Sequence, residues 1–358
     1  MKRIIYLCGL MLAAVCVHAQ NVIKSTDTLH IHYMGRVEFG KETATLWWPG
    51  TSVKIKFKGT SVKAVLKDQL GLNYFKVIVD GHIVKTLHPD SLKNSYELSS
   101  HLSNTNHTLE LFKRTEWDKG KTELYSFILN DHSVILPAPA AKKRKIEFFG
   151  NSITCGYAVL DSSGKDRGTA EFEDNYLSYA TITARHFDAE YSCIAKSGIG
   201  VMVSWFPIIM PEMYNRLDPT NPYSRWDFSK YTPDVVVINL FQNDSWIVKQ
   251  PDNTQFKFRF GDKAPTESQI ILSYEDLVEK IRHVYPKAQI ICALGNMDAT
   301  KEGSPWPGYV QKAVAELKDP NIYTCFFPFK NTSGHPNVKE QRDMADQLIT
   351  FINEHIKW

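Results

Sequence analysis

The chain has 358 residues, enough for two domains, and 43% of them are apolar, enough to build sizeable cores. If Lys2 and Arg3 leave with an N-terminal leader, 40 of the 42 basic residues remain against 39 acidic ones. That balance argues against nucleic acid or an anionic membrane surface as a partner. Beyond the leader no apolar run approaches the ~20 residues of a membrane span, so we expect none.

Residues 1–19 have the pattern of a secretory signal peptide. A basic start is followed by an apolar core over residues 4–15 and by a small-residue cleavage site at residues 17–19. We therefore expect cleavage after Ala19 and a secreted or periplasmic protein. Cys16 leaves lipoprotein anchoring as an alternative, less favoured because Val15 precedes it and the usual upstream leucine is missing.

Four cysteines remain after cleavage: Cys155, Cys193, Cys292 and Cys325. Export permits disulfides, but the last three lie inside strand-like runs, where cysteine often behaves as a small buried apolar residue. Whether any of them pair is left open. No CxxC pair exists, which argues against a structural zinc site, and we expect no metal and no cofactor.

Residues 20–138 are expected to form an all-β domain. Short apolar runs, such as 53–58, 62–66 and 73–79, alternate with turn signals at a spacing of ~8–12 residues. The alternation has a period of two, which predicts a β-sandwich or jelly roll. Two prolines and several small residues over 136–142 then predict a linker.

Residues 139–358 change to alternating strand and helix patterns, which predict a doubly wound α/β domain. The expected strands are 146–149, 191–195, 235–240, 289–294 and 322–326, and the expected helices are 174–187, 272–285, 307–317 and 338–356. Such sheets gather ligand sites at the carboxyl ends of their strands. We find no internal repeat and no low-complexity segment.

Four residues lie directly after predicted strands or at a late helix start, where the fold would bring them together: Ser152, Gly198, Asn243 and His335. A serine, a histidine and donors for an oxyanion are what ester hydrolysis needs. Each residue also has a simpler reading. Ser152 could cap a helix, His335 could be an exposed helix-entry residue, Gly198 a tight turn and Asn243 an Asx turn.

The order Gly-x-Ser, Gly, Asn-Asp and His-Pro resembles the block order of the SGNH (GDSL-like) hydrolases, whose α/β domain is flavodoxin-like. With the preceding β-domain and the run Gly150-Asn-Ser-Ile-Thr-Cys-Gly-Tyr157, the chain resembles carbohydrate esterase family 2. Members of that family remove acetyl groups from plant cell-wall polysaccharides. The resemblance implies Ser152 as nucleophile and His335 as base. It implies an oxyanion hole of the Ser152 and Gly198 N–H groups and the Asn243 side chain.

Three positions depart from the SGNH pattern. Asn151 replaces the common aspartate before the serine, and Phe241 replaces the common glycine before Asn243. Thr332 stands where an aspartate usually lies three residues before the histidine. We therefore expect a Ser-His dyad, with a backbone carbonyl near Thr332 or Ser333 orienting the His335 ring. The alternative is a distant carboxylate, for which Asp244 and Asp298 are the first candidates.

The site loops also carry Trp205, Trp246 and Trp306, which could stack on sugar rings or simply pack between loop and core. The favoured function is a secreted esterase that removes O-acetyl groups from plant cell-wall polysaccharide or oligosaccharide. The alternatives are an SGNH lipase or thioesterase, and a non-catalytic carbohydrate-binding protein with a degenerate hydrolase domain. The sequence does not indicate which hydroxyl is deacetylated, nor the oligomeric state.

Overall fold

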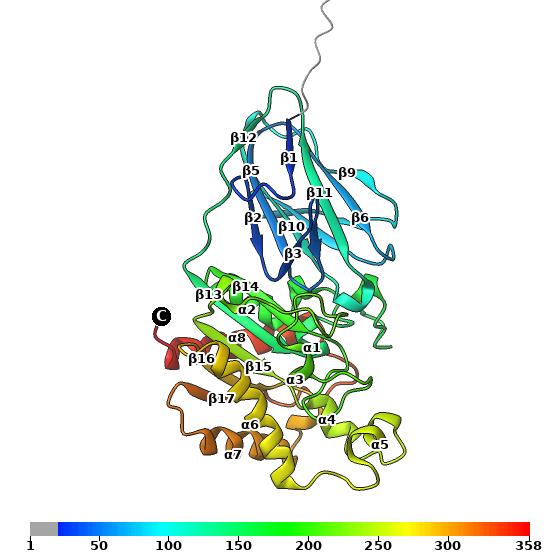
Figure 1. Cartoon of the computed structure of the whole chain (residues 1–358), viewed down its shortest axis with the longest axis vertical. Helices are drawn as coiled ribbons and strands as arrows, with labels where there is room; N and C mark the ends of the chain where they lie inside the picture. Colours follow the sequence, from blue (N-terminus) through cyan, green and yellow to red (C-terminus); the bar gives the residue numbers. More distant parts are fainter. Residues whose placement is uncertain (1–20) are drawn as a thin grey trace, which may run out of the picture.

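The computed structural model describes residues 21–358, so the expected leader lies outside the described part. Figure 1 shows strands in the upper part of the molecule and an α/β layer below them. Residues 21–136 form two antiparallel sheets. The first contains β1 (Asn21–Lys24), β3 (Val37–Phe39), β4 (Ala44–Leu46), β6 (Val62–Asp68), β9 (Asn94–Ser99) and β11 (Thr122–Leu129). The second contains β2 (Ile31–Met34), β5 (Ser52–Gly59), β7 (Phe75–Val79), β8 (His82–Leu87), β10 (Thr105–Lys113) and β12 (Val134–Leu136).

The period-two pattern of β5 explains how these sheets enclose a core. Val53, Ile55 and Phe57 are buried, whereas the lysines between them are more exposed. Successive side chains of a strand point to opposite faces, so one face is apolar and the other polar. The predicted all-β character of this part is confirmed. Its jelly-roll strand order and its boundary at residues 138/139 stay predictions.

The third sheet is parallel and follows the strand order of doubly wound flavodoxin-like folds. It contains β13 (Arg144–Gly150), β14 (Ala189–Ala195), β15 (Val235–Asn239), β16 (Gln289–Leu294) and β17 (Ile322–Phe326), in the spatial order β14-β13-β15-β16-β17. The first strand therefore lies between the second and third. The predicted α/β fold is confirmed, and each predicted strand is found to within three residues.

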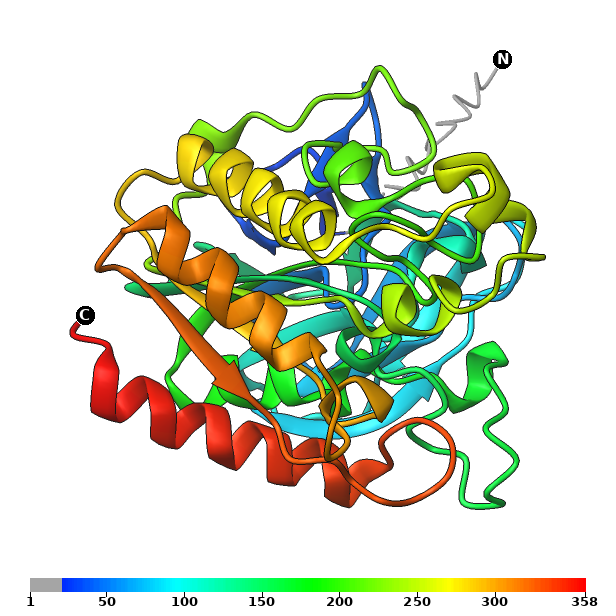
Figure 2. The same ribbon diagram turned by 90° about the horizontal axis from the view of Figure 1, so that it is seen from below.

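Helices cover both faces of this sheet, as Figure 2 shows. They are α1 (Ser152–Cys155), α2 (Tyr179–His186), α3 (Met210–Met213), α4 (Gln242–Ile247), α5 (Thr254–Phe260), α6 (Glu267–Val284), α7 (Trp306–Leu317) and α8 (Val338–His355). Short 3₁₀ turns are η1 (Trp117–Lys119), η2 (Ala170–Phe172), η3 (Asn175–Leu177), η4 (Phe228–Lys230) and η5 (Asp298–Thr300). Phe148 packs in the core cluster that contains α2 and α8, and Phe149 in the one that contains α6 and α7. Within residues 21–358, none of the helices combines the length and apolar character needed to cross a membrane.

The predicted helix over residues 174–187 is two elements instead of one. Asp174 caps η3, and Ser178 then has an extended backbone and caps α2 by accepting a hydrogen bond from the Thr181 N–H. Serine and aspartate compete with helical hydrogen bonding in this way, which the hydrophobic pattern does not record. Cys155, Cys193, Cys292 and Cys325 are buried free thiols.

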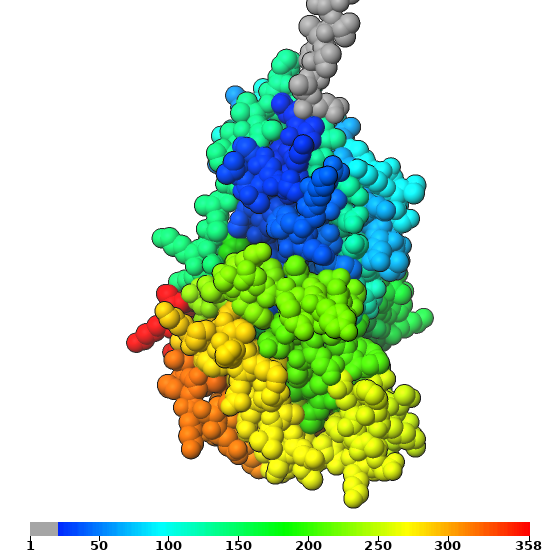
Figure 3. All heavy atoms as spheres, viewed as in Figure 1, coloured from blue at the N-terminus to red at the C-terminus, as the bar shows by residue number. Residues whose placement is uncertain are grey.

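A buried ion pair joins the β-sheets to the α/β part. Arg36 contacts the Glu147 carboxylate at 3.3 Å, and both side chains are fully buried. The Arg36 guanidinium also donates to the carbonyl oxygens of Tyr214 and Arg216 at 2.6 and 2.9 Å. In Figure 3 the yellow-green surface lies directly against the blue strands. The two parts therefore share desolvated polar contacts as well as a surface.

We expect Arg36→Ala to lower the free energy of unfolding by ~3–5 kcal/mol, because it leaves the Glu147 charge buried and unpaired. Urea unfolding followed by tryptophan fluorescence measures the change. Arg225→Ala, which removes an exposed arginine, is the control. The double variant Arg36→Met, Glu147→Gln should recover much of the loss, since no uncompensated charge remains. A loss below ~1 kcal/mol for Arg36→Ala would show that the pair is structurally unimportant.

Candidate active site

Ser152 is the first residue of α1 and lies two residues after the end of β13. The helix cap is the preceding Asn151, whose Oδ1 accepts a hydrogen bond from the Ile153 N–H at 3.1 Å. The capping role considered for Ser152 is therefore taken by its neighbour, and the Ser152 hydroxyl remains available. Gly150 is required at this turn, because a Cβ there would lie 2.0 Å from Thr154 Oγ1.

His335 joins Ser152 to a carboxylate that sequence reasoning missed. The His335 Nε2 atom lies 2.8 Å from Ser152 Oγ, and Nδ1 lies 2.9 and 3.0 Å from the two oxygens of Asp166. The His335 main-chain N–H also donates to Asp166 at 2.8 Å. A carboxylate on Nδ1 fixes the tautomer in which Nε2 accepts the serine proton. The three side chains have the arrangement of a Ser-His-Asp triad.

The expectation that a backbone carbonyl near Thr332 or Ser333 orients His335 is therefore wrong. The two other candidate carboxylates, Asp244 and Asp298, also do not contact His335. Asp298 accepts a hydrogen bond from Trp246 Nε1 at 2.8 Å, and Asp244 accepts from the backbone N–H groups of residues 201–203. Asp166 comes from the loop between α1 and η2, about 170 residues before the histidine.

The loop that carries Asp166 is held by its own polar contacts. Asp161 accepts hydrogen bonds from the Ser163 and Arg167 main-chain N–H groups and from the Arg167 guanidinium. Burial acts to raise the pKa of Asp166, but the hydrogen bonds and positive charge of His335 outweigh it. The pKa of Asp166 therefore lies below its ordinary value, and the carboxylate is ionised at neutral pH.

The Gly198 N–H group lies in the loop after β14. This residue has a φ of +84°, a backbone conformation that residues other than glycine rarely adopt, so the turn requires glycine. Its carbonyl accepts from the Trp205 N–H at 3.1 Å. Glu116, from the β-sheet part, accepts a hydrogen bond from the adjacent Ser197 N–H at 2.6 Å. A residue of the first part therefore holds the loop that presents Gly198.

The Asn243 side chain is fixed in one orientation. Its Oδ1 accepts from Trp205 Nε1 at 3.0 Å, and its Nδ2 donates to the Ile199 carbonyl at 2.8 Å. Indole nitrogen only donates, so the amide oxygen must face Trp205. The second hydrogen on Nδ2 is then left for a developing oxyanion.

Phe241, the departure before Asn243, does not narrow the cavity. Its φ is +75°, a backbone conformation that favours glycine, and its ring is fully buried against Tyr274 and Trp306. The left-handed backbone costs ~1–2 kcal/mol, which burial of the aromatic ring offsets. The ring faces the α6 and α7 side of the sheet.

Ser152, Gly198, Asn243 and His335 line one open cavity of about 370 Å³. Trp205 and Trp246 also line it, together with Asp118 and Lys196, whose side chains lie 3.3 Å apart. Trp205 is 44% exposed and can present its ring to a ligand. Trp306 is only 2% exposed and packs on Phe241 and Tyr309, so the sugar-stacking role considered for it is wrong.

We expect Asp244→Asn to loosen the loop behind the oxyanion donors. The carboxylate accepts from three consecutive N–H groups, and an amide would turn its NH₂ toward some of them. The free energy of unfolding at neutral pH should fall by ~1–3 kcal/mol, with a lower kcat. Asp252→Asn, at a fully exposed aspartate, is the control.

The same variant tests a pH effect. Burial raises the pKa of Asp244 from 3.8 to about 6, and the backbone hydrogen bonds only partly offset this. Because the folded pKa is above the unfolded one, this group favours folding below pH ~4, and its contribution is lost as the pH rises through 6. Unfolding measured from pH 4 to 7 should show that loss in the wild type and not in Asp244→Asn. Equal pH slopes would contradict the assignment.

Sequence reasoning missed Asp166 and Glu116. The loop 158–173 is rich in acidic and small residues, which marks it as a surface loop, but no spacing relates Asp166 to His335. Glu116 lies in the run Lys113-Arg-Thr-Glu-Trp117 at the end of the predicted β-strands, and nothing in that run indicates a contact with residue 197.

The site has the geometry of a serine hydrolase on a flavodoxin-like sheet. Comparison with known proteins narrows this class to one family. The N-terminal model of carbohydrate esterase 2 matches residues 33–139. A solved structure of a family two carbohydrate esterase from Clostridium thermocellum, in complex with cellohexaose, is 32% identical with a TM-score of 0.81. The match covers 90% of this chain and 98% of that one. The chain belongs to carbohydrate esterase family 2, whose members are carboxylic ester hydrolases.

Two other relatives are similar along nearly the whole chain. The cellulase/esterase CelE of Acetivibrio thermocellus is 33% identical over 344 residues, which is 93% of this chain but only 40% of that protein. This chain thus spans well under half the length of CelE. An acetylxylan esterase / glucomannan deacetylase of Cellvibrio japonicus is 24% identical, covering 99% of this chain and 98% of the relative.

Proposed function

We propose that the protein is an exported esterase that removes O-acetyl groups from plant cell-wall polysaccharide or oligosaccharide by acyl transfer to Ser152. The observation that carries the proposal is the hydrogen-bonded series Ser152, His335 and Asp166 at a cavity with tryptophan walls. The relatives named for acetylxylan and glucomannan, and the one that holds cellohexaose, support a polysaccharide as substrate.

The reaction follows from the positions of the donors and acceptors. His335 Nε2 accepts the Ser152 proton as Oγ attacks the acetyl carbonyl carbon. The N–H groups of Ser152 and Gly198 and the Asn243 amide stabilise the oxyanion, each worth about 3–4 kcal/mol in the transition state. Protonated His335 then gives its proton to the departing sugar oxygen. Water, activated by the same nitrogen, releases acetate from the acyl-enzyme.

The cavity walls favour a small acyl group on a sugar over a long acyl chain. The lining combines Asp118, Lys196 and the Ser152 hydroxyl with the side chains of Trp205, Trp246 and Phe206. A pyranose combines an apolar C–H face with a polar rim, and this lining offers partners for both. A fatty-acyl chain would leave the charged pair without hydrogen bonds to its ligand.

Hydrolysis of p-nitrophenyl acetate and p-nitrophenyl palmitate, with Ser152→Ala as control, tests the proposal. Activity on acetate alone supports it, activity on palmitate favours the lipase or thioesterase alternative, and none on either favours a non-catalytic binding protein. Acetate released in parallel from acetylated xylan, glucomannan and pectin then identifies the substrate.

We expect EDTA to leave acetyl-ester hydrolysis unchanged. The proposed reaction obtains its nucleophile from His335 and its charge stabilisation from N–H donors, so it leaves no step for a metal. The initial rate on p-nitrophenyl acetate is measured before and after dialysis against EDTA. A loss of rate that a divalent ion restores would contradict the mechanism.

A further inference from the structure

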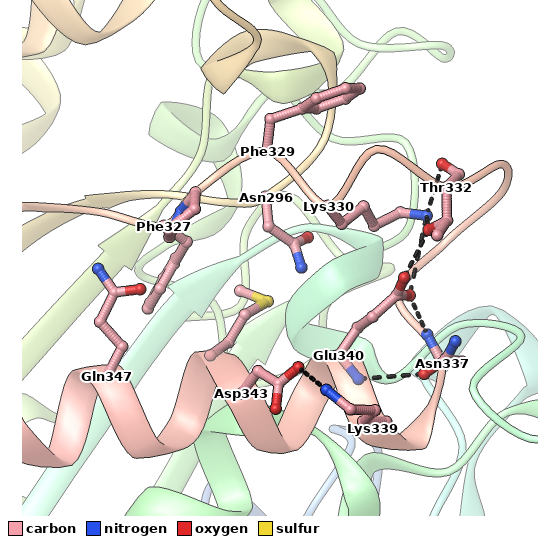
Figure 4. A pocket seen from close by; sticks show the side chains of 12 residues that line it. Asn296, Phe327, Phe329, Lys330, Thr332, Asn337, Lys339, Glu340, Asp343 and Gln347 are labelled. Carbon is pink, nitrogen blue, oxygen red and sulfur yellow. Dashed lines mark hydrogen bonds and ion pairs between the residues drawn. The ribbon is translucent and has the colours of Figure 1, made fainter.

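A second cavity, of about 660 Å³, lies between the segment after β17 and helix α8. Figure 4 shows Phe327, Phe329 and Lys330 on one side and the helix on the other. Asn296, which follows β16, projects between them. The second cavity therefore lies at the same carboxyl edge of the sheet as the catalytic cavity. It lies after strands β16 and β17, at one side of the sheet.

Asn296 is held in place and yet lacks a partner. Its main-chain carbonyl accepts a hydrogen bond from the Lys330 N–H at 2.8 Å. The residue is 3% exposed, and its buried Oδ1 atom has no hydrogen-bond partner among residues 21–358. An unpartnered buried acceptor costs free energy, so this amide is expected to receive a donor from a molecule in the cavity.

The charges around the cavity are already paired with one another. Lys330 donates to the carbonyls of Thr332 and Ser333 and lies 3.8 Å from the Glu340 carboxylate. Lys339 lies 2.6 Å from Asp343. Neither sign of charge is in excess, so the cavity favours a neutral ligand over an anion such as phosphate or a cationic amine.

The remaining lining combines amides with an apolar surface. Gln347 donates its amide N–H to the Phe326 carbonyl, which leaves its side-chain oxygen as an acceptor. Phe329 is partly exposed, and Met344 forms part of the wall. A neutral molecule with many hydroxyl donors and one apolar face fits this set, and a pyranose ring is such a molecule.

We propose that this cavity is a second carbohydrate site, which takes one or two neutral sugar units of the polysaccharide, away from the unit that is deacetylated. The proposal rests on the proposed function for its ligand class. A smaller hollow of about 260 Å³ shares Thr332 and Asn337 with this cavity and His335 with the catalytic one. A polysaccharide held at the second site would keep neighbouring acetylated units close to Ser152.

The test uses the full-length mature chain with ¹³C-methyl methionine. Ser152 is first blocked with diethyl p-nitrophenyl phosphate, and the adduct is verified by mass. The protein is then titrated separately with xylohexaose, mannohexaose and cellohexaose, and the Met344 methyl signal, assigned with Met344→Leu, reports the second cavity alone. We expect this signal to shift with at least one saccharide while the catalytic cavity is occupied.

Variants then locate the interaction. Asn296→Leu, which removes the unpartnered amide, should weaken binding at least ~10-fold, and Phe329→Ala at a partly exposed ring should weaken it by a similar factor. Asp343→Ala tests whether the carboxylate at the rim of the cavity contributes to saccharide binding. Asp346→Ala, on the same helix but outside the cavity lining, is the matched control and should bind as the wild type does.

The outcomes separate this proposal from the proposed function. A phosphoryl adduct with no shift of the Met344 signal, up to the solubility limit of all three saccharides, would overturn the second site and leave the esterase intact. Undiminished binding by both Asn296→Leu and Phe329→Ala would also overturn it. Failure to form the adduct, with no hydrolysis of p-nitrophenyl acetate, would overturn the proposed function, whereas the titration would still report the second cavity.

Discussion

Ser152→Ala and His335→Ala are each expected to lower kcat on p-nitrophenyl acetate by at least ~10³-fold. The first removes the atom that attacks the carbonyl, and the second removes the ring nitrogen that lies 2.8 Å from it. Because the two groups act as one unit, the double variant should be about as slow as either single variant. The residual rate would come from the oxyanion donors and from substrate binding.

Two controls make this result specific. Ser197→Ala removes a hydroxyl from the same cavity, and His355→Ala removes an imidazole from the distant end of α8. Both should stay within ~10-fold of the wild type, since neither side chain touches the Ser152 to His335 hydrogen bond. More than about a tenth of wild-type activity in Ser152→Ala or His335→Ala would show that acyl transfer does not run through that residue.

Asp166→Asn has the second largest expected effect, a loss of ~10²–10⁴-fold in kcat. The amide can donate to His335 Nδ1, which favours the tautomer with a proton on Nε2, the wrong one for a base. KM should change little, because the Asp166 side chain lies behind the ring and away from the acyl group. Asp262→Asn, at an exposed loop aspartate, is the control.

Asp166 acts through His335, so it is a positioning residue, and its role has a signature in the pH dependence of folding. Its pKa in the folded protein lies below the ordinary value, so its contribution to stability is present at neutral pH and lost as the pH falls through the folded pKa. The difference in unfolding free energy between wild type and Asp166→Asn should shrink toward acid pH. A constant difference would point to lost packing instead.

Thr332→Asp, at the position where the SGNH pattern has its aspartate, should not restore activity to Asp166→Ala. The Thr332 hydroxyl contacts Lys330 and Glu340, so a carboxylate there would meet Lys330 rather than His335. Rescue above ~10-fold over Asp166→Ala would show that the 332–335 segment can orient the ring by itself, as the dyad expectation assumed.

Periodicity and turn chemistry predicted most of the fold. Strands β15 and β16 of the parallel sheet are nearly continuous apolar runs, because both of their faces are buried. Strand β5 alternates lysine with Val53, Ile55 and Phe57, because only one of its faces is buried. These patterns are local, so they can be recognised without knowing the tertiary contacts. The break between η3 and α2 at Ser178 was not predicted, because a single side-chain hydrogen bond decides such a cap.

Local sequence therefore determined the two kinds of sheet, the order of the elements, and the positions of Ser152, Gly198, Asn243 and His335 at strand ends and helix starts. It did so because the parallel sheet brings its carboxyl ends to one edge whatever the loops do. Only the tertiary structure decided which carboxylate reaches His335, since the Asp166 loop is placed by contacts of Asp161 and Arg167. It also decided that Trp205 faces the cavity while Trp306 is buried behind Phe241, because which side of a loop faces solvent depends on partners far away in the chain.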